Sequence, residues 1–135
     1  MDRKERNQKL SHLGYLASMS KSDMGIDDRE RKFFFWVADR LDVGTTTAQK
    51  ILDHPEDMQL KKPEFHEHRR EVLMDILTMM VVDKKLDKKE LELCRKFSYH
   101  MGFRSDIVEK VVKGLFDYSL NNITKVDVQE LIDQL

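Results

Sequence analysis

Two short acidic segments carry the clearest arrangement of side chains that could bind a ligand. Each segment has the form Asp-x-x-(Ile or Leu)-Asp-x-x-Glu. Their carboxylates belong to Asp23, Asp27 and Glu30 in the first segment and to Asp83, Asp87 and Glu90 in the second. This spacing matches the fifth, ninth and twelfth positions of an EF-hand loop, whose oxygen ligands bind Ca²⁺. One interpretation is therefore a divalent-cation site, for Ca²⁺ or Mg²⁺, in each segment.

The same residues also fit a purely structural role at the start of a helix. An Asp that precedes a helix, followed three residues later by Glu, forms a capping box that satisfies free backbone N–H groups. Asp27 and Asp87 would be the N-caps, and Glu30 and Glu90 the third helical residues. The earlier EF-hand positions hold methionine, lysine or valine instead of oxygen ligands, and lysines crowd the second segment. Capping is therefore favoured, and the first segment is the better candidate for a metal.

Other reactive residue types do not form a recognisable constellation. His66 and His68 are two residues apart, so on a helix they point in different directions and make a poor zinc pair. The single cysteine, Cys94, aligns with Phe34 in the repeat described below, which predicts a core position. The sequence contains no glycine-rich phosphate loop, nucleophile elbow or His-Glu-x-x-His motif. We therefore predict no catalytic residue and no enzymatic activity.

The charge and hydropathy of the chain exclude several classes of partner. Lys and Arg total 24 and Asp and Glu total 25, whereas proteins that bind nucleic acid usually carry a basic excess. The longest strongly apolar run, Ile76 to Val82, is too short to span a bilayer. One cysteine cannot form an internal disulfide, which fits a reducing compartment. We expect no nucleic-acid binding, no membrane insertion and a cytoplasmic location.

Helical periodicity extends over almost the whole chain. Only two prolines and five glycines interrupt it, and no segment alternates like a strand. Helices are expected over about 3–21, 28–41 and 63–82, the last with Pro63 in its first turn. Further helices should follow the caps Thr45, Asp87, Ser105 and Thr124. The sequence thus predicts an all-α fold of about seven helices.

The chain also aligns with itself when it is shifted by sixty residues. Six of forty positions are identical without a gap, and the caps and apolar positions coincide. We interpret this as a duplicated three-helix unit within one domain, 1–135. The predicted parts are repeat one (about 3–53), a linker (54–62), repeat two (about 63–118) and a short terminal helix (about 124–135). The repeats should pack against each other with pseudo-twofold symmetry.

A duplicated helix–acidic loop–helix pattern of this kind resembles the tellurite-resistance TerB-like family. The resemblance extends over about Leu10 to Leu115 and rests on the two acidic segments. It implies a compact helical domain with clustered acidic residues, for which metal binding has been proposed, and an association with stress responses. The usual Asp-Gly of that loop is replaced here by Asp23-Met24 and Asp83-Lys84.

One aromatic pair distinguishes the first repeat from the second. Phe35 and Trp36 align with Arg95 and Lys96, whose charges should face solvent, so the aromatic pair should also lie on an outer surface. Either the 54–62 linker or the terminal helix covers the pair, or it forms an interface for self-association or for a protein partner. We therefore expect a non-catalytic TerB-like interaction domain, and as the alternative a domain that binds divalent cations.

Overall fold

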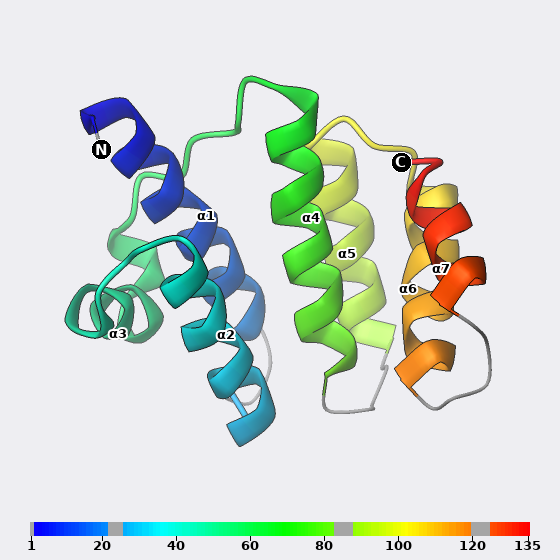
Figure 1. The fold of residues 1–135 in the computed structure, drawn as a ribbon, viewed down its shortest axis with the longest axis horizontal. Coiled ribbons are helices and arrows are strands. Elements are labelled where there is room, and N and C mark those ends of the chain that lie inside the picture. Colours follow the sequence, from blue (N-terminus) through cyan, green and yellow to red (C-terminus); the bar gives the residue numbers. More distant parts are fainter. Residues whose placement is uncertain (1, 22–25, 83–87, 120–124) are drawn as a thin grey trace. The chain divides into compact units, whose positions relative to one another are not determined.

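The computed structural model describes residues 2–21, 26–82, 88–119 and 125–135 (Figure 1). This part of the chain contains seven α-helices, one short 3-10 helix and no strand, which confirms the all-α prediction. The helices are α1 (Arg3–Lys21), α2 (Asp28–Arg40), α3 (Thr45–Asp53), η1 (Pro55–Asp57), α4 (His66–Val81), α5 (Lys88–His100), α6 (Ser105–Ser119) and α7 (Lys125–Ile132).

Three predicted helix starts, those of α3, α4 and α6, were wrong by a few residues. Ser105 is the first residue of α6 and not its cap, since the Val108 N–H donates to the Arg104 carbonyl at 3.1 Å. Helix α3 begins at Thr45, but its N-cap is Gly44, whose carbonyl accepts the Ala48 N–H at 2.9 Å. Gly44 adopts the extended cap geometry and makes no side-chain cap bond, so Thr45 is the first helical residue and not the cap. Helix α4 begins at His66, and its first turn is closed by the Arg69 N–H on the Phe65 carbonyl at 3.1 Å. Pro63 therefore belongs to the preceding connection.

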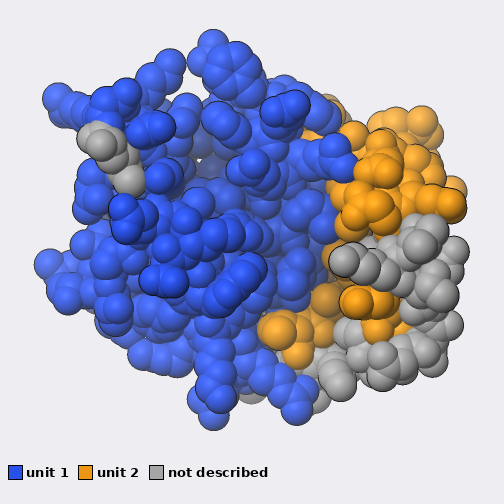
Figure 2. Space-filling view, viewed as in Figure 1, with its two compact units in different colours: residues 1–79 blue, residues 80–135 orange. Residues whose placement is uncertain are grey.

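Contacts divide the chain into two compact units, Met1–Met79 and Met80–Leu135 (Figure 2). This division falls within α4, whereas the sequence suggested the 54–62 connection. In the first unit α1 packs against α2, α3 and η1, and α2 packs against α3. Its largest fully buried side chains are Leu13, Leu16, Phe34, Val37, Leu52, Leu73, Ile76 and Leu77. In the second unit α6 packs against both α5 and α7.

The same helix–turn–helix geometry occurs twice, sixty residues apart. Helices α2 and α5 begin and end at equivalent positions, and α3 and α6 begin at equivalent positions. The turn after α2 has backbone hydrogen bonds from Leu41 to Val37, from Asp42 to Asp39 and from Val43 to Ala38, at 2.9, 3.0 and 2.8 Å. The turn after α5 has equivalent bonds from Met101 to Phe97, from Gly102 to Tyr99 and from Phe103 to Ser98, at 2.9, 3.1 and 2.8 Å. Both are Schellman turns, which satisfy the last carbonyls of a helix.

The burial of side chains also repeats after sixty residues. Residues 43–50 and 103–110 have the same sequence of buried, half-buried and exposed positions. A shared backbone with a shared core pattern is what a duplicated unit requires, since each copy must bury the same face. The predicted sixty-residue correspondence is therefore confirmed for the local structure of α2–α3 and α5–α6.

The two Schellman turns differ at the residue that takes a left-handed conformation. This residue is Asp42 in the first copy, with φ 59°, and Gly102 in the second, with φ 83°. A left-handed backbone costs a residue with a side chain about 1–2 kcal/mol, and glycine is free of that cost. Open space surrounds the position where a Cβ would stand on Gly102, so the cost of adding one is conformational.

We predict that Gly102→Ala and Asp42→Gly change stability in opposite directions. Gly102→Ala should lower the free energy of unfolding by about 1 kcal/mol, because alanine, unlike glycine, is strained in the left-handed conformation. Asp42→Gly should raise it by about 0.5 kcal/mol, because relief of that cost exceeds the greater chain entropy of glycine. Urea unfolding followed by circular dichroism measures both changes. A change of the same sign in both variants would show that the left-handed geometry is not the cause.

Candidate functional site

The described part of the first acidic segment contains a helix cap. Asp27 has extended backbone angles (φ −82°, ψ 172°), and its Oδ1 accepts the Glu30 N–H at 2.9 Å. The Asp27 carbonyl accepts the Arg31 N–H at 2.9 Å, which begins α2. The predicted N-cap role of Asp27 is therefore confirmed, and one of its carboxylate oxygens is occupied by the helix.

Of the six candidate metal ligands in the two segments, the structure describes the side chains of two, Asp27 and Glu30. Asp23, Asp83 and Asp87 lie outside the described residues, and so does the side chain of Glu90. The described part of the chain contains no group of three or more His, Cys, Asp or Glu side chains that could hold a metal ion. The structure thus brings together only Asp27 and Glu30, and divalent-cation binding by the acidic segments stays a prediction.

Substitutions at Asp27 separate capping from metal binding. A capping role predicts that Asp27→Ala lowers the free energy of unfolding by about 1 kcal/mol and that Asp27→Ser keeps most of the stability. Thermal melts of chelator-treated protein, with and without Ca²⁺ or Mg²⁺, provide the test. Because a bound ion stabilises the folded state, a metal site would raise the melting temperature of the wild type and not of Asp27→Ser. We expect the wild type and the serine variant to respond alike.

The predicted aromatic pair lies on α2 with unequal exposure. Trp36 is 57 % exposed, whereas Phe35 is half-buried and meets Phe34 edge-on with 5.5 Å between ring centroids. The outward position predicted from the repeat therefore holds for Trp36 and only in part for Phe35. At the equivalent positions of α5, Arg95 and Lys96 are both exposed.

Trp36 is held between two neighbours on its own helix. Its ring stacks on Phe33 with 5.8 Å between centroids and 30° between planes. The Arg40 guanidinium carbon lies 5.4 Å from the Trp36 ring centroid, which is within cation–π distance. These contacts order the indole while more than half of its surface remains open.

Arg40 also reaches a buried carboxylate that the sequence analysis did not single out. Asp75 on α4 is 6 % exposed and His12 on α1 is 7 % exposed. The His12 Nε2 lies 2.6 Å from Asp75 Oδ2, and the Arg40 Nη1 donates to Asp75 Oδ1 at 3.1 Å. The Arg40 Nη2 donates to Asp75 Oδ2 as well, so the arginine engages the carboxylate through both nitrogens. We call these three residues the Asp75 network.

Hydrogen bonds from His12 and Arg40 keep Asp75 ionised. Burial by itself would raise the pKa of this carboxyl group, because a charge is poorly solvated inside the protein. Hydrogen bonds from His12 and Arg40, with the attraction of their charges, outweigh burial and hold the pKa of Asp75 below its ordinary value. An ionised carboxylate only accepts hydrogen bonds, so the His12 Nε2 donates. The network therefore joins α1, α2 and α4 through a single negative charge.

A signal for Asp75 exists in the sequence, although no pattern identifies its partners. Asp75 is the only charged residue between Val72 and Val82. A charge in such an apolar segment is costly to bury unless it is paired, so a lone aspartate there predicts a buried cation nearby. His12 and Arg40 are 63 and 35 residues away along the chain, and only the packing of α1 and α2 on α4 brings them to Asp75.

We predict that Asp75→Asn lowers the free energy of unfolding by about 2 kcal/mol at neutral pH, because the exposed Arg40 guanidinium loses its counter-charge and the buried His12 ring loses its charged acceptor. The folded-state pKa of Asp75 is depressed, so its stabilisation is present above the ordinary aspartate pKa. It is lost as the pH falls through the lower folded pKa. The free energies of unfolding of the wild type and of Asp75→Asn, measured from neutral to acidic pH, should therefore become more similar as the pH falls.

The exposed Asp57 of η1 supplies a matched control for this experiment. Asp57→Asn removes the same charge at the surface and should change stability by no more than about 0.5 kcal/mol at any pH. A gap between wild type and Asp75→Asn that stayed constant from neutral to acidic pH would contradict an ionised Asp75.

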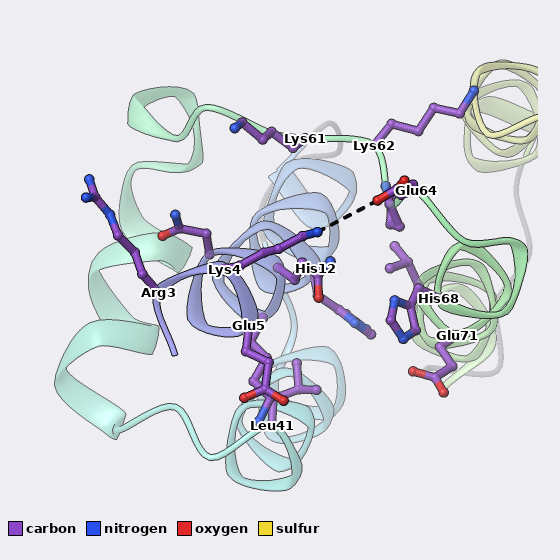
Figure 3. Close-up of a pocket in the computed structure, with 15 residues that line it drawn as sticks. Arg3, Lys4, Glu5, His12, Leu41, Lys61, Lys62, Glu64, His68 and Glu71 are labelled. Atoms are coloured by element: carbon purple, nitrogen blue, oxygen red, sulfur yellow. Dashed lines mark ion pairs between the residues drawn. The ribbon is translucent and has the colours of Figure 1, made fainter. Parts of the chain in front are cut away.

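His12 also lines a cavity of about 720 Å³ within the first unit (Figure 3). One wall is the N-terminal half of α1, and the opposite side is formed by residues 61–64 and the first turns of α4. Figure 3 shows Lys4 extending from α1 toward Glu64, to an ion pair of 3.9 Å. The described residues that line this cavity include no Ser, Thr, Cys or Tyr that could act as a nucleophile.

The other chemically interesting residues have structural or solvated positions. Cys94 is buried, and burial raises the pKa of its thiol to about 11, as expected for a core residue rather than a reactive thiolate. His66 and His68 are exposed at the start of α4. His68 lines the cavity and meets Phe65 edge-on, with 5.9 Å between ring centroids, and His66 is not among the residues lining it.

Comparisons of this chain with protein-family models, with curated proteins and with solved structures found no match. Among the described helices, none combines the length and the apolar character needed to cross a membrane.

Proposed function

We propose that this chain is a non-catalytic, TerB-like interaction domain that binds a protein partner through the outer face of α2. The contact surface consists of Phe33, Trp36 and Arg40, and we call it the α2 aromatic surface. The observation that carries the proposal is the 57 % exposure of an ordered tryptophan on a helix whose duplicate has charged residues instead.

The comparison of the two copies shows why this exposure needs an explanation. Helices α2 and α5 have equivalent bounds and end in equivalent turns. In α5 the equivalent positions carry Arg95 and Lys96, both solvated. A helix of this geometry therefore folds with lysine at the position of Trp36, so the aromatic residue is not required by the fold. Exposed aromatic residues that the fold does not need often mark binding surfaces.

The chemistry of the surface suits protein recognition. Tryptophan and arginine are the residues most enriched among those that dominate binding energy at protein interfaces. Trp36 is already stacked on Phe33, and Arg40 is anchored by Asp75, so binding would immobilise few additional side chains. A contact made by ordered side chains loses less conformational entropy than one made by mobile side chains.

The TerB-like part of the proposal rests on the duplicated acidic segment and its helix-capping geometry. The Asp27 cap supports the capping role of the first acidic segment, and the sixty-residue correspondence of the turns after α2 and α5 supports a helical unit present twice. By resemblance, such a domain would act in a stress response, and its single cysteine favours the reducing cytoplasm.

The first partner to test is a second copy of the chain. Light scattering over a concentration series should show that the average mass of the wild type rises with concentration. Trp36→Glu should remain at the monomer mass, because a buried carboxylate without a partner opposes association. Lys96→Glu is the matched control, since it places the same side chain at the equivalent exposed position of α5, and it should behave like the wild type.

Circular dichroism of each variant verifies that the helical content is retained. A wild type that stays monomeric throughout would contradict self-association. Equal weakening by Trp36→Glu and Lys96→Glu would show that added charge, rather than loss of the indole, controls association, and would contradict the α2 aromatic surface.

A further inference from the structure

The cavity beside the Asp75 network is large enough for a small organic molecule. Its volume of about 720 Å³ lies within the range of about 300–1,000 Å³ that is usual for small-molecule sites. All of its lining residues belong to the first compact unit. Two half-buried apolar side chains, Leu41 and Pro63, contribute to its surface, and the amides of Asn7 and Gln8 offer hydrogen-bond donors. It therefore combines an apolar area with polar groups, as ligand sites do.

The charges that line the cavity are unlike those of the chain as a whole. Five lining residues are basic and three are acidic, an excess of two positive charges, whereas the whole chain has a net charge of −1. The basic residues are Arg3, Lys4, Lys9, Lys61 and Lys62. Within the described part of the chain, only Lys4 among these five has an acidic partner, the exposed Glu64 at 3.9 Å. Exposed pairs at that distance contribute little, so Lys4 is also available to a ligand.

His12 gives the cavity a fixed polar group. Its Nε2 is held by Asp75, so the orientation of the ring is set and Nδ1 is the ring nitrogen left for a ligand. An anion beside Nδ1 would let both ring nitrogens donate, one to Asp75 and the other to the anion. A buried carboxylate that orients a histidine in this way is a common means of fixing an imidazole for binding.

Figure 3 shows how the labelled groups are distributed around the cavity. Lys4 extends across the opening above His12, and the ring of His68 lies on the opposite side, on α4. The ends of Arg3, Lys61 and Lys62 point outward at the rim. The flexible rim cations can turn inward when an anion is bound.

We propose that this cavity binds a small organic phosphate, with the phosphate group between Lys4, Lys9 and His12 and the organic part against Leu41 and Pro63. A phosphate group carries about 1.5–2 negative charges near neutral pH, which matches the excess of positive charge around the cavity. It also accepts several hydrogen bonds from lysine, histidine and amide donors. The volume exceeds what inorganic phosphate fills, so the ligand is a phosphate ester. This inference is independent of the α2 aromatic surface.

Nuclear magnetic resonance on the ¹⁵N-labelled full chain tests the proposal. Inorganic phosphate and glycerol phosphate are titrated at constant ionic strength, with sodium chloride as the balancing salt. We expect saturable shifts of the His12 ring nitrogens and of the Asn7 and Lys9 amides. The exposed His54 and His100 do not line the cavity and should not respond. Glycerol phosphate should bind more tightly than inorganic phosphate, because it also covers apolar surface.

A pair of charge reversals locates the site. Lys9→Glu should weaken binding of glycerol phosphate by about tenfold or more, because a charge-assisted hydrogen bond is replaced by repulsion. Lys50→Glu makes the same change on the exposed face of α3, outside the cavity, and should leave binding within about twofold of wild type. Lys9→Gln provides a neutral variant with an intermediate loss, and amide spectra verify that each variant is folded.

Three outcomes would overturn the proposal. The first is the absence of saturable shifts with either phosphate. The second is an equal loss of affinity in Lys9→Glu and Lys50→Glu, which indicates attraction by net charge alone. The third is saturable binding of citrate where neither phosphate binds, which assigns the cavity to carboxylates.

Discussion

One buried negative charge constrains much of the first compact unit. Asp75 is a buried charge on α4, and an ion placed there is unstable unless oppositely charged or hydrogen-bonding groups accompany it. His12 comes from α1 and Arg40 from the last turn of α2, so the pairing sets the positions of both helices against α4. Each of these two partners also contributes to a different feature of the surface. Arg40 supports the exposed indole of Trp36, and His12 forms part of the cavity wall.

Duplication accounts for the backbone, and divergence between the copies accounts for the distinctive chemistry. The turns after α2 and α5 share their hydrogen bonds, and the burial pattern around them is conserved between the copies. The side chains that stand out are those in which the copies differ. Tyr15 occupies the position equivalent to Asp75, and Val72 the position equivalent to His12. The fold is therefore a shared framework, and the copies carry different side chains at equivalent buried positions.

The sequence predicted the fold better than the site, for a physical reason. Helical periodicity, caps and the internal repeat are local signals, and they placed α1 and α2 within one residue of their observed ends. The Asp27 cap was predictable because its partner is three residues away. The Asp75 network joins residues that are far apart in the chain, and a single sequence does not reveal which helices meet. No sequence pattern therefore marks His12 or the cavity beside it.

The double role of Arg40 has a thermodynamic consequence. Its guanidinium contacts the Trp36 ring and the Asp75 carboxylate at once, while Asp75 also holds His12. A molecule that settles on the indole and pulls the guanidinium outward would loosen the carboxylate and change how firmly the imidazole is oriented. Linkage makes this effect reciprocal, so occupancy of the cavity would alter affinity at the helix surface by the same factor. Arg40, Asp75 and His12 thus form a continuous series of contacts between the α2 aromatic surface and the cavity.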